Sequence, residues 1–137
     1  MIFIPTIVFR GNPQGAKPIF GVGAAGNAWI TSAVYAALVG HLDWGLDAQR
    51  ALELPRFLPG GRNAFGPPGA TAAFTIEYED GFAPSVIRAL EAKGWEMLPI
   101  SLRGELRMGY GAAVSIDGRT ATAGADPRRA GSAGAVP

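Results

Sequence analysis

The chain has 137 residues, a net charge of +1, no cysteine and a single histidine, His41. The length fits one domain with a buried core, and the lack of cysteine excludes disulfides, thiolate nucleophiles and cysteine-based metal sites. A histidine-rich metal centre is also excluded. The scattered lysines and arginines form no basic stripe, which argues against nucleic acid as a partner.

Hydrophobic residues make up 48% of the chain and charged residues 17%, with 20 glycines and 11 prolines. The charged fraction of soluble domains averages about 25%, so the composition predicts a sheet-rich chain or a piece of a larger assembly that covers its apolar surface. We expect no transmembrane segment, because no stretch approaches roughly 20 apolar residues. The apolar start is short and broken by Pro5, which is untypical of a signal peptide. No membrane partner is therefore expected.

The first predicted elements form a hairpin. β-Branched and aromatic residues over 1–9 predict a buried strand, centred on Thr6–Phe9. A turn over Gly11–Gly15 joins it to a second strand over Pro18–Val22.

The small-residue run Gly23–Asn27 connects this second strand to a helix. Such a junction lets other groups approach the backbone and leaves helix N–H groups free for an anion or an oxyanion, although a tight turn without chemistry is the alternative. We expect Asn27 to be the N-cap of the helix. His41 falls late in the helix, where a structural role is favoured over a catalytic one. The apolar face of the helix is predicted at Ile30, Val34, Leu38 and Leu42.

The middle of the chain begins with a short helix over Ala48–Glu53, capped by Asp47 and ending before Pro55. A loop is expected over Pro59–Pro68, followed by a half-buried strand over Thr71–Tyr78. The inward residues of that strand are predicted to be Phe74, Ile76 and Tyr78. The acidic cluster at its end is interpreted as a solvated turn rather than a catalytic pair, and comprises Glu77, Glu79 and Asp80.

The last third of the chain predicts a helix, a strand and a hairpin. Pro84 suits the first position of the helix and Gly94 its C′ position. A short strand is expected over Trp95–Ile100, and a hairpin over Ala112–Ala123 is predicted to turn at Asp117-Gly118.

The order of these elements predicts the α+β class, with an antiparallel sheet and covering helices. We find no internal repeat and no domain boundary, so residues 1–137 are expected to form a single domain. Residues 130–137 are rich in glycine and alanine and are predicted to be a flexible tail.

Several segments, taken in order, carry a family resemblance. They are Pro5-Thr6-Ile7-Val8, Gly23-Ala24-Ala25-Gly26-Asn27 with its helix, Leu54-Pro55-Arg56-Phe57, Gly81-Phe82-Ala83-Pro84, Glu91-Ala92-Lys93-Gly94 and Ala125-Asp126-Pro127-Arg128. This set resembles the C-terminal part of the small subunit of γ-glutamyltranspeptidases, also called glutathione hydrolases. The resemblance covers nearly the whole chain, and the order makes it more specific than any one motif.

The resemblance implies part of an αββα N-terminal-nucleophile hydrolase sandwich, so residues 1–137 would be a single partial domain. It implies a precursor that cleaves itself and frees a threonine at the start of the small subunit. That threonine attacks the γ-glutamyl amide, with its own α-amine as general base, and the acyl group passes to water or an acceptor amine. No cofactor and no metal are implied.

By this resemblance the nucleophilic threonine lies upstream of Pro5–Val8, so Thr6 is not the nucleophile and no catalytic side chain is expected in this chain. The family's paired serines would fall at about Met1 and Ile2, so they are absent or replaced. The large subunit, which supplies an arginine for the substrate carboxylate, is also missing. The isolated chain is therefore predicted to be inactive, even though the family is enzymatic.

The resemblance implies one remaining piece of active site, the turn whose backbone N–H groups form the oxyanion hole. Its two donors map onto Gly26 and Asn27. Ala24 and Ala25, together with Asn27, depart from the family's Gly-Ser-Pro-Gly-Gly pattern, which bears on substrate preference. Structural roles are expected for Arg56, Asp126 and Arg128.

Two functions are carried forward from the sequence. In the first, the chain is a γ-glutamyltranspeptidase-like piece whose partners are the upstream part of the small subunit and the large subunit, with γ-glutamyl compounds bound only in the complete enzyme. In the second, it is a non-catalytic module that associates with itself or with another subunit through unpaired strand edges. An independent serine or threonine enzyme using His41 is disfavoured, because no elbow motif surrounds a serine. The compartment stays open, and the resemblance is compatible with a periplasmic or secreted protein.

Overall fold

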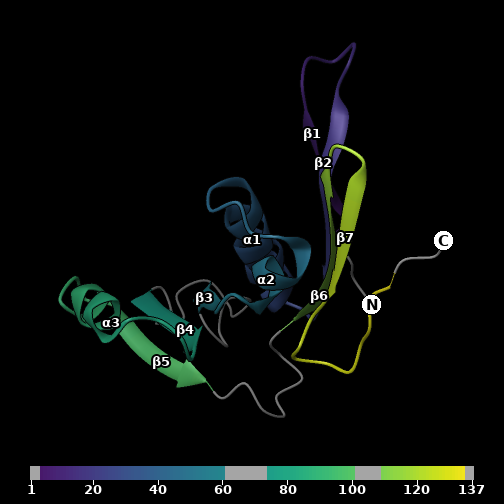
Figure 1. Cartoon of the computed structure of the whole chain (residues 1–137). Helices are drawn as coiled ribbons and strands as arrows, with labels where there is room; N and C mark the ends of the chain where they lie inside the picture. Colours follow the sequence, from purple (N-terminus) through teal and green to yellow (C-terminus); the bar gives the residue numbers. More distant parts are fainter. Residues whose placement is uncertain (1–3, 61–73, 101–108, 135–137) are drawn as a thin grey trace. The chain divides into compact units, whose positions relative to one another are not determined.

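The structure, a computed structural model, describes residues 4–60, 74–100 and 109–134. Two compact units divide the chain, one formed by Met1–Leu54 with Arg107–Pro137 and the other by Pro55–Leu106. The mixture of helices and sheets confirms the predicted α+β class (Figure 1). A single partial domain over residues 1–137 remains a prediction. Most of the predicted loop at 59–68 lies outside the described residues, as does the start of the following strand.

The first unit contains a four-stranded antiparallel sheet with the order β1-β2-β6-β7. Its strands are β1 (Thr6–Arg10), β2 (Lys17–Ala25), β6 (Tyr110–Asp117) and β7 (Thr120–Ala125). Both predicted hairpins are thereby confirmed. Because β2 and β6 are central, the first hairpin is joined to the last one by a pairing between segments that lie far apart in the sequence.

Two details of these hairpins differ from the prediction. Asp117 pairs with Thr120, so the turn starts at Gly118 rather than at Asp117. Gly118 has φ +59°, a conformation that glycine adopts without strain. The prediction of a buried first strand is wrong, since Ile7 is 62% exposed and Phe9 56% exposed. β1 is an edge strand, and both side chains leave the face on which the helices pack.

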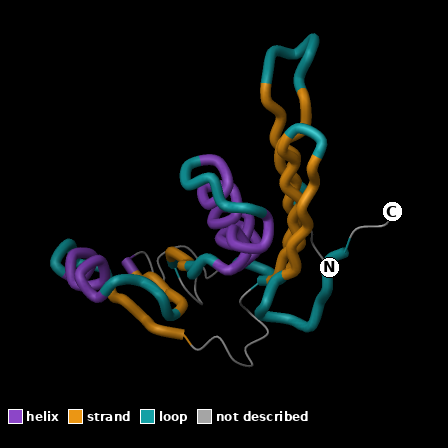
Figure 2. Tube along the Cα trace, viewed as in Figure 1, coloured by secondary structure: helices purple, strands orange, loops and turns teal. Residues whose placement is uncertain are grey.

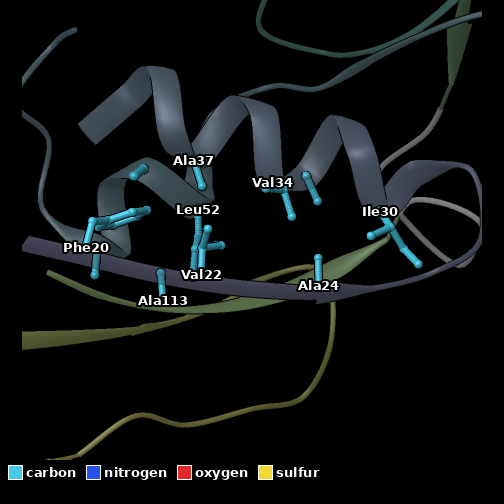
Figure 3. Packing of buried hydrophobic residues seen from close by; sticks show 11 residues of the cluster. Phe20, Val22, Ala24, Ile30, Val34, Ala37, Leu52 and Ala113 are labelled. Carbon is cyan, nitrogen blue, oxygen red and sulfur yellow. The ribbon is translucent and has the colours of Figure 1, made fainter. Parts of the chain in front are cut away.

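Helices α1 (Trp29–Leu42) and α2 (Ala48–Glu53) cover one face of this sheet (Figure 3). Of the predicted helix face, Ile30 and Val34 are buried and Leu38 is partly buried against the core, whereas Leu42 is 48% exposed. Alanines give α1 a slim profile against the strands. The core consists of Phe20, Val22, Ala24, Ile30, Ala33, Val34, Ala37, Ala48, Ala51, Leu52 and Ala113. None of the described helices has the length and apolarity needed to cross a membrane.

Helix α2 is fixed against the end of β7 by two kinds of contact. A Cβ placed on Gly124 would lie 2.7 Å from the carbonyl carbon of Ala48, so helix and strand backbones approach closely. The side-chain amide of Gln49 donates to the Ala125 carbonyl oxygen at 3.1 Å and accepts from the Ala125 N–H at 3.0 Å. Gln49 therefore occupies the position of a neighbouring strand at this point of the sheet edge. Asp47 caps α2 as predicted, because its carboxylate accepts from the Arg50 N–H at 2.8 Å.

The second unit contains a three-stranded sheet with the order β3-β4-β5 (Figure 2). Its elements are β3 (Phe57–Pro59), β4 (Thr75–Glu79), α3 (Pro84–Glu91) and β5 (Glu96–Ile100). The β4–β5 pair is parallel, an arrangement that the sequence did not indicate, and α3 is the crossover that parallel neighbours require. Pro84 begins α3 as predicted, whereas Ala92 is the C-cap and Gly94 lies one residue beyond C′.

Of the inward residues predicted for β4, Ile76 is buried at 7% exposure as expected, but the predicted alternation fails because residues on the other face are buried as well. Phe74 precedes the strand and is 65% exposed, whereas Glu77 and Glu79 are 3% and 0% exposed. The interpretation of the acidic cluster as a solvated turn is therefore wrong for Glu77 and Glu79, whereas Asp80 is exposed and lies in a turn as predicted. Glu79 tolerates burial because its carboxylate accepts the Arg56 backbone N–H at 2.9 Å.

The close approach of α2 to β7 predicts that Gly124→Ala destabilises the chain by about 1–3 kcal/mol, the usual range for overpacking. The matched control is Gly21→Ala in the same sheet, where the nearest atom to an added Cβ is the Thr6 carbonyl oxygen at 4.0 Å. Urea unfolding followed by circular dichroism measures both free energies. Equal losses in the two variants would contradict the assigned contact.

Candidate functional site

The candidate site is the turn between the end of β2 at Ala25 and the start of α1 at Trp29. Gly26 has φ +129° and Asn27 has φ +55°. The first value is open to glycine, and the second lies in the left-handed region that asparagine tolerates better than most residues. The prediction of Asn27 as N-cap is wrong: Ala28 holds that position in the right-handed helical conformation, with no capping side-chain hydrogen bond.

The carbonyl groups of the turn are used by the helix. The Gly26 carbonyl oxygen accepts from the Trp29 N–H and the Asn27 carbonyl oxygen from the Ile30 N–H, each at 3.2 Å. Within the described part of the chain, the N–H groups of Gly26 and Asn27 donate to no protein acceptor. Two neighbouring unused N–H groups at a helix start are the kind of donor pair that stabilises a developing oxyanion.

The turn is backed by Gly109, which the sequence analysis missed. A Cβ placed on Gly26 would overlap the Cα of Gly109 and lie 2.7 Å from its nitrogen. A Cβ placed on Gly109 would lie 2.8 Å from the Trp29 carbonyl oxygen. The available signal was the glycine-rich approach to β6, where Gly109 and Gly111 stand two residues apart.

The two predicted structural residues near the C-terminus, Asp126 and Arg128, form one buried ion pair. The Arg128 Nη1 and Asp126 Oδ1 atoms are 3.0 Å apart, and the side chains are 6% and 2% exposed. Arg128 also donates to the Leu52 carbonyl oxygen at 2.8 Å and the Leu54 carbonyl oxygen at 2.9 Å. The guanidinium thus binds the carbonyl end of α2, where a cation is favourable.

The Asp126 carboxylate links this pair to β6. Its Oδ2 accepts the Gly111 N–H at 2.9 Å, and the Asp126 N–H donates to the Gly111 carbonyl oxygen at 3.1 Å. Asp126 therefore continues the β6–β7 ladder beyond Ala125. Together with Arg128 it joins the C-terminal end of α2 and the start of β6 in one buried cluster. The start of β6, which backs the candidate turn, is held by this cluster.

Arg56 and His41 each have contacts of their own within their units. Arg56 belongs to the second unit and is 1% exposed, with its carbonyl oxygen accepting the Glu79 N–H at 2.9 Å. The His41 Nδ1 donates to the Leu46 carbonyl oxygen at 2.8 Å, and its ring stacks on Phe20 at a centroid distance of 4.3 Å. These contacts give His41 a structural role in the first unit. No group of three or more metal-ligating side chains occurs in residues 4–60, 74–100 and 109–134.

The buried pair predicts that Arg128→Met lowers the free energy of unfolding by about 3–5 kcal/mol, because the Asp126 carboxylate loses its buried partner. The control is Arg50→Met. The ion pair of Arg50 with Asp47 is exposed, with side chains 74% and 49% accessible, and such pairs contribute under about 1 kcal/mol. Denaturant titration of both variants measures the difference, and similar losses would rule out a buried anchoring role.

Comparison with known proteins places this geometry in context. The family model described as gamma-glutamyltranspeptidase matches residues 2–136. The glutathione hydrolase proenzyme of Bacillus subtilis is 29% identical over 90 residues, which cover 66% of this chain and 13% of that protein.

Solved structures show the same fold. The γ-glutamyltranspeptidase of Pseudomonas nitroreducens, complexed with L-DON, matches with a TM-score of 0.72 and 22% identity, over 98% of this chain and 62% of that one. A mutant γ-glutamyltranspeptidase of Helicobacter pylori matches with a TM-score of 0.70 and 20% identity, over 93% of this chain and 61% of that one. The fold predicted from the sequence, part of an αββα N-terminal-nucleophile hydrolase, is confirmed. The chain spans only part of the length of these relatives. With a family match that extends over nearly all its residues, the chain belongs to the γ-glutamyltranspeptidase family.

Proposed function

We propose that this chain contributes the oxyanion turn and the supporting scaffold of a γ-glutamyl-transferring or γ-glutamyl-hydrolysing enzyme. The observation that carries the proposal is the turn at Gly26 and Asn27. Its two N–H groups donate to no protein acceptor in the part of the chain that the structure describes. Family membership supports the reaction class. The turn supports the role of these residues, since backbone donors need no particular side chain.

In the proposed reaction the chain acts on charge that develops elsewhere in the substrate. A threonine hydroxyl supplied from outside these 137 residues attacks the γ-glutamyl carbonyl carbon, and its proton passes to a base. The carbonyl oxygen becomes an oxyanion and accepts hydrogen bonds from Gly26 and Asn27. When the C–N bond breaks, the proton moves to the leaving amine and the acyl-enzyme remains for water or an acceptor amine.

The partner surface that we propose is the outer face of the four-stranded sheet, opposite α1 and α2. Ile7, Gly21, Val114 and Ala123 lie side by side across all four strands on this face. Ile7 is 62% and Val114 41% exposed. An αββα sandwich packs a second sheet on such a face, so the upstream part of the small subunit and the large subunit are the proposed partners.

The reaction proposal predicts that the 137-residue chain alone releases no product from a γ-glutamyl anilide. A chimaera in which it replaces the segment that it matches in the Bacillus subtilis relative should cleave itself and release product. In that chimaera Gly26→Ala should lower kcat about 10²–10³-fold, as much as the loss of one oxyanion donor, because the added Cβ overlaps the Cα of Gly109 and displaces the donor N–H groups.

The control for Gly26→Ala is Gly45→Ala, at another positive-φ glycine (+68°) with no atom within 4 Å of an added Cβ. It should retain the activity of the unsubstituted chimaera. Product release by the isolated chain that survives both Gly26→Ala and Thr6→Ala would contradict the proposal.

The exposed outer face also supports a second function, self-association of the chain in the absence of other subunits. We expect the isolated chain to be oligomeric, and Val114→Glu to shift it toward a monomer because a charge then falls within the apolar row. Arg50→Glu, an exposed change on α2, should leave the size unchanged. Size-exclusion chromatography with light scattering measures each form, and a monomeric unsubstituted chain would contradict this second function.

A further inference from the structure

We propose that Gly109 is a positioning residue that sets the geometry of the Gly26–Asn27 turn by backbone contact. The inference rests on the proposed function for its catalytic meaning, but its structural part stands on contacts within the first unit. Gly109 donates no group to a substrate in this proposal. It acts through the turn that it touches.

The register of the sheet brings Gly109 to this place. Ala25, the last residue of β2, pairs with Tyr110, the first residue of β6. The next position of the antiparallel register places Gly26 opposite Gly109. At this point a Cβ on Gly26 would be directed at the backbone of Gly109 and would overlap its Cα.

Gly109 touches both ends of the turn. On one side it meets Gly26. On the other side, a Cβ on Gly109 would lie 2.8 Å from the Trp29 carbonyl oxygen, 3.0 Å from the Trp29 carbonyl carbon and 3.1 Å from the Trp29 Cβ. Two of these three atoms are backbone, so the contact cannot be relieved by turning a side chain. A methyl group at residue 109 must therefore push β6 and the first turn of α1 apart.

The position of Gly109 is also fixed from the other side of β6. Gly111 is bracketed by Asp126 through the two hydrogen bonds of 2.9 and 3.1 Å. Asp126 is held in turn by Arg128. The start of β6 cannot move away from α1 without breaking this buried cluster. A Cβ at residue 109 would therefore displace the Gly26–Asn27 turn instead. A displacement of about 1 Å in such a site costs on the order of 10² in rate.

The experiment compares Gly109→Ala with Gly118→Ala in the Val114→Glu background, which is expected to be monomeric. Both glycines flank β6 and have nearly the same left-handed φ, +55° and +59°, but nothing lies within 4 Å of a Cβ on Gly118. The two variants carry equal backbone strain and differ in the contact alone.

Hydrogen exchange of the Trp29 and Ile30 amides is the first readout, since these amides bond to the Gly26 and Asn27 carbonyl oxygens. Gly109→Ala should raise their exchange rates at least tenfold over those in Gly118→Ala. In Gly118→Ala, faster exchange should be confined to amides near the β6–β7 turn. Equal exchange in the two variants would overturn the inference. If Gly109→Ala does not fold, a nuclear Overhauser effect between the α-protons of Gly26 and Gly109 in the unsubstituted sequence tests the contact, and its absence overturns the inference.

The second readout is kinetic, in the chimaera with the Bacillus subtilis relative. Gly109→Ala should lower kcat about 10²-fold with KM unchanged, as expected when a transition-state interaction is lost, while Gly118→Ala keeps its activity. If Gly26→Ala lowers kcat and Gly109→Ala does not, the positioning role fails and the proposed function stands. If neither lowers kcat, the oxyanion role itself fails, whatever the exchange data show.

Discussion

The first unit depends on backbone approaching backbone at places where a side chain would not fit. Gly26 meets Gly109 where the end of β2 faces the start of β6, and Gly124 meets the first turn of α2. Alanines continue this pattern along α1 and β2 into the core. Small residues permit close packing of helix on sheet, but each buries little apolar area. The backbones of helix and sheet therefore lie closer together, but each residue buries less hydrophobic area.

Buried polar side chains add links between helix and strands that the small residues do not provide. Arg128 holds the carbonyl end of α2 and Asp126 holds β6, so one ion pair joins helix α2 to strand β6. Gln49 adds a second link by occupying the open edge of β7 at Ala125. Buried pairs of this kind are costly when one partner is removed and specify geometry more than they add stability. In this chain the specified geometry includes the backbone that supports the candidate turn.

Local patterns allowed much of the fold to be predicted. The cap at Asp47, the proline at the start of α3 and both hairpins follow from short-range chemistry, and the structure confirms them. What failed depends on partners distant in sequence. Glu79 is buried because the backbone of Arg56 meets its carboxylate, and no periodicity within β4 contains that information.

In the candidate site, too, local sequence predicted some features, and others depend on residues distant in the sequence. Its turn was visible in the sequence as a run of small residues, whereas the conformation of Asn27 and the presence of Gly109 were not. Asn27 was expected to cap the helix because asparagine favours that position, but the same residue also tolerates positive φ, and it adopts φ +55° here. Gly109 is recognisable only once the register of β6 against β2 is known.

The low charge of the chain has a physical explanation in its sheet. One face carries α1 and α2, and the other presents a row of apolar and glycine residues across all four strands. A sheet with one solvated face normally alternates apolar and polar residues, and this one does not. Residues 21–24 of β2 read Gly-Val-Gly-Ala, with no polar side chain on either face. Such a strand matches the middle of a sandwich, where both faces are covered, and its composition agrees with the second sheet that we propose as the cover of the outer face.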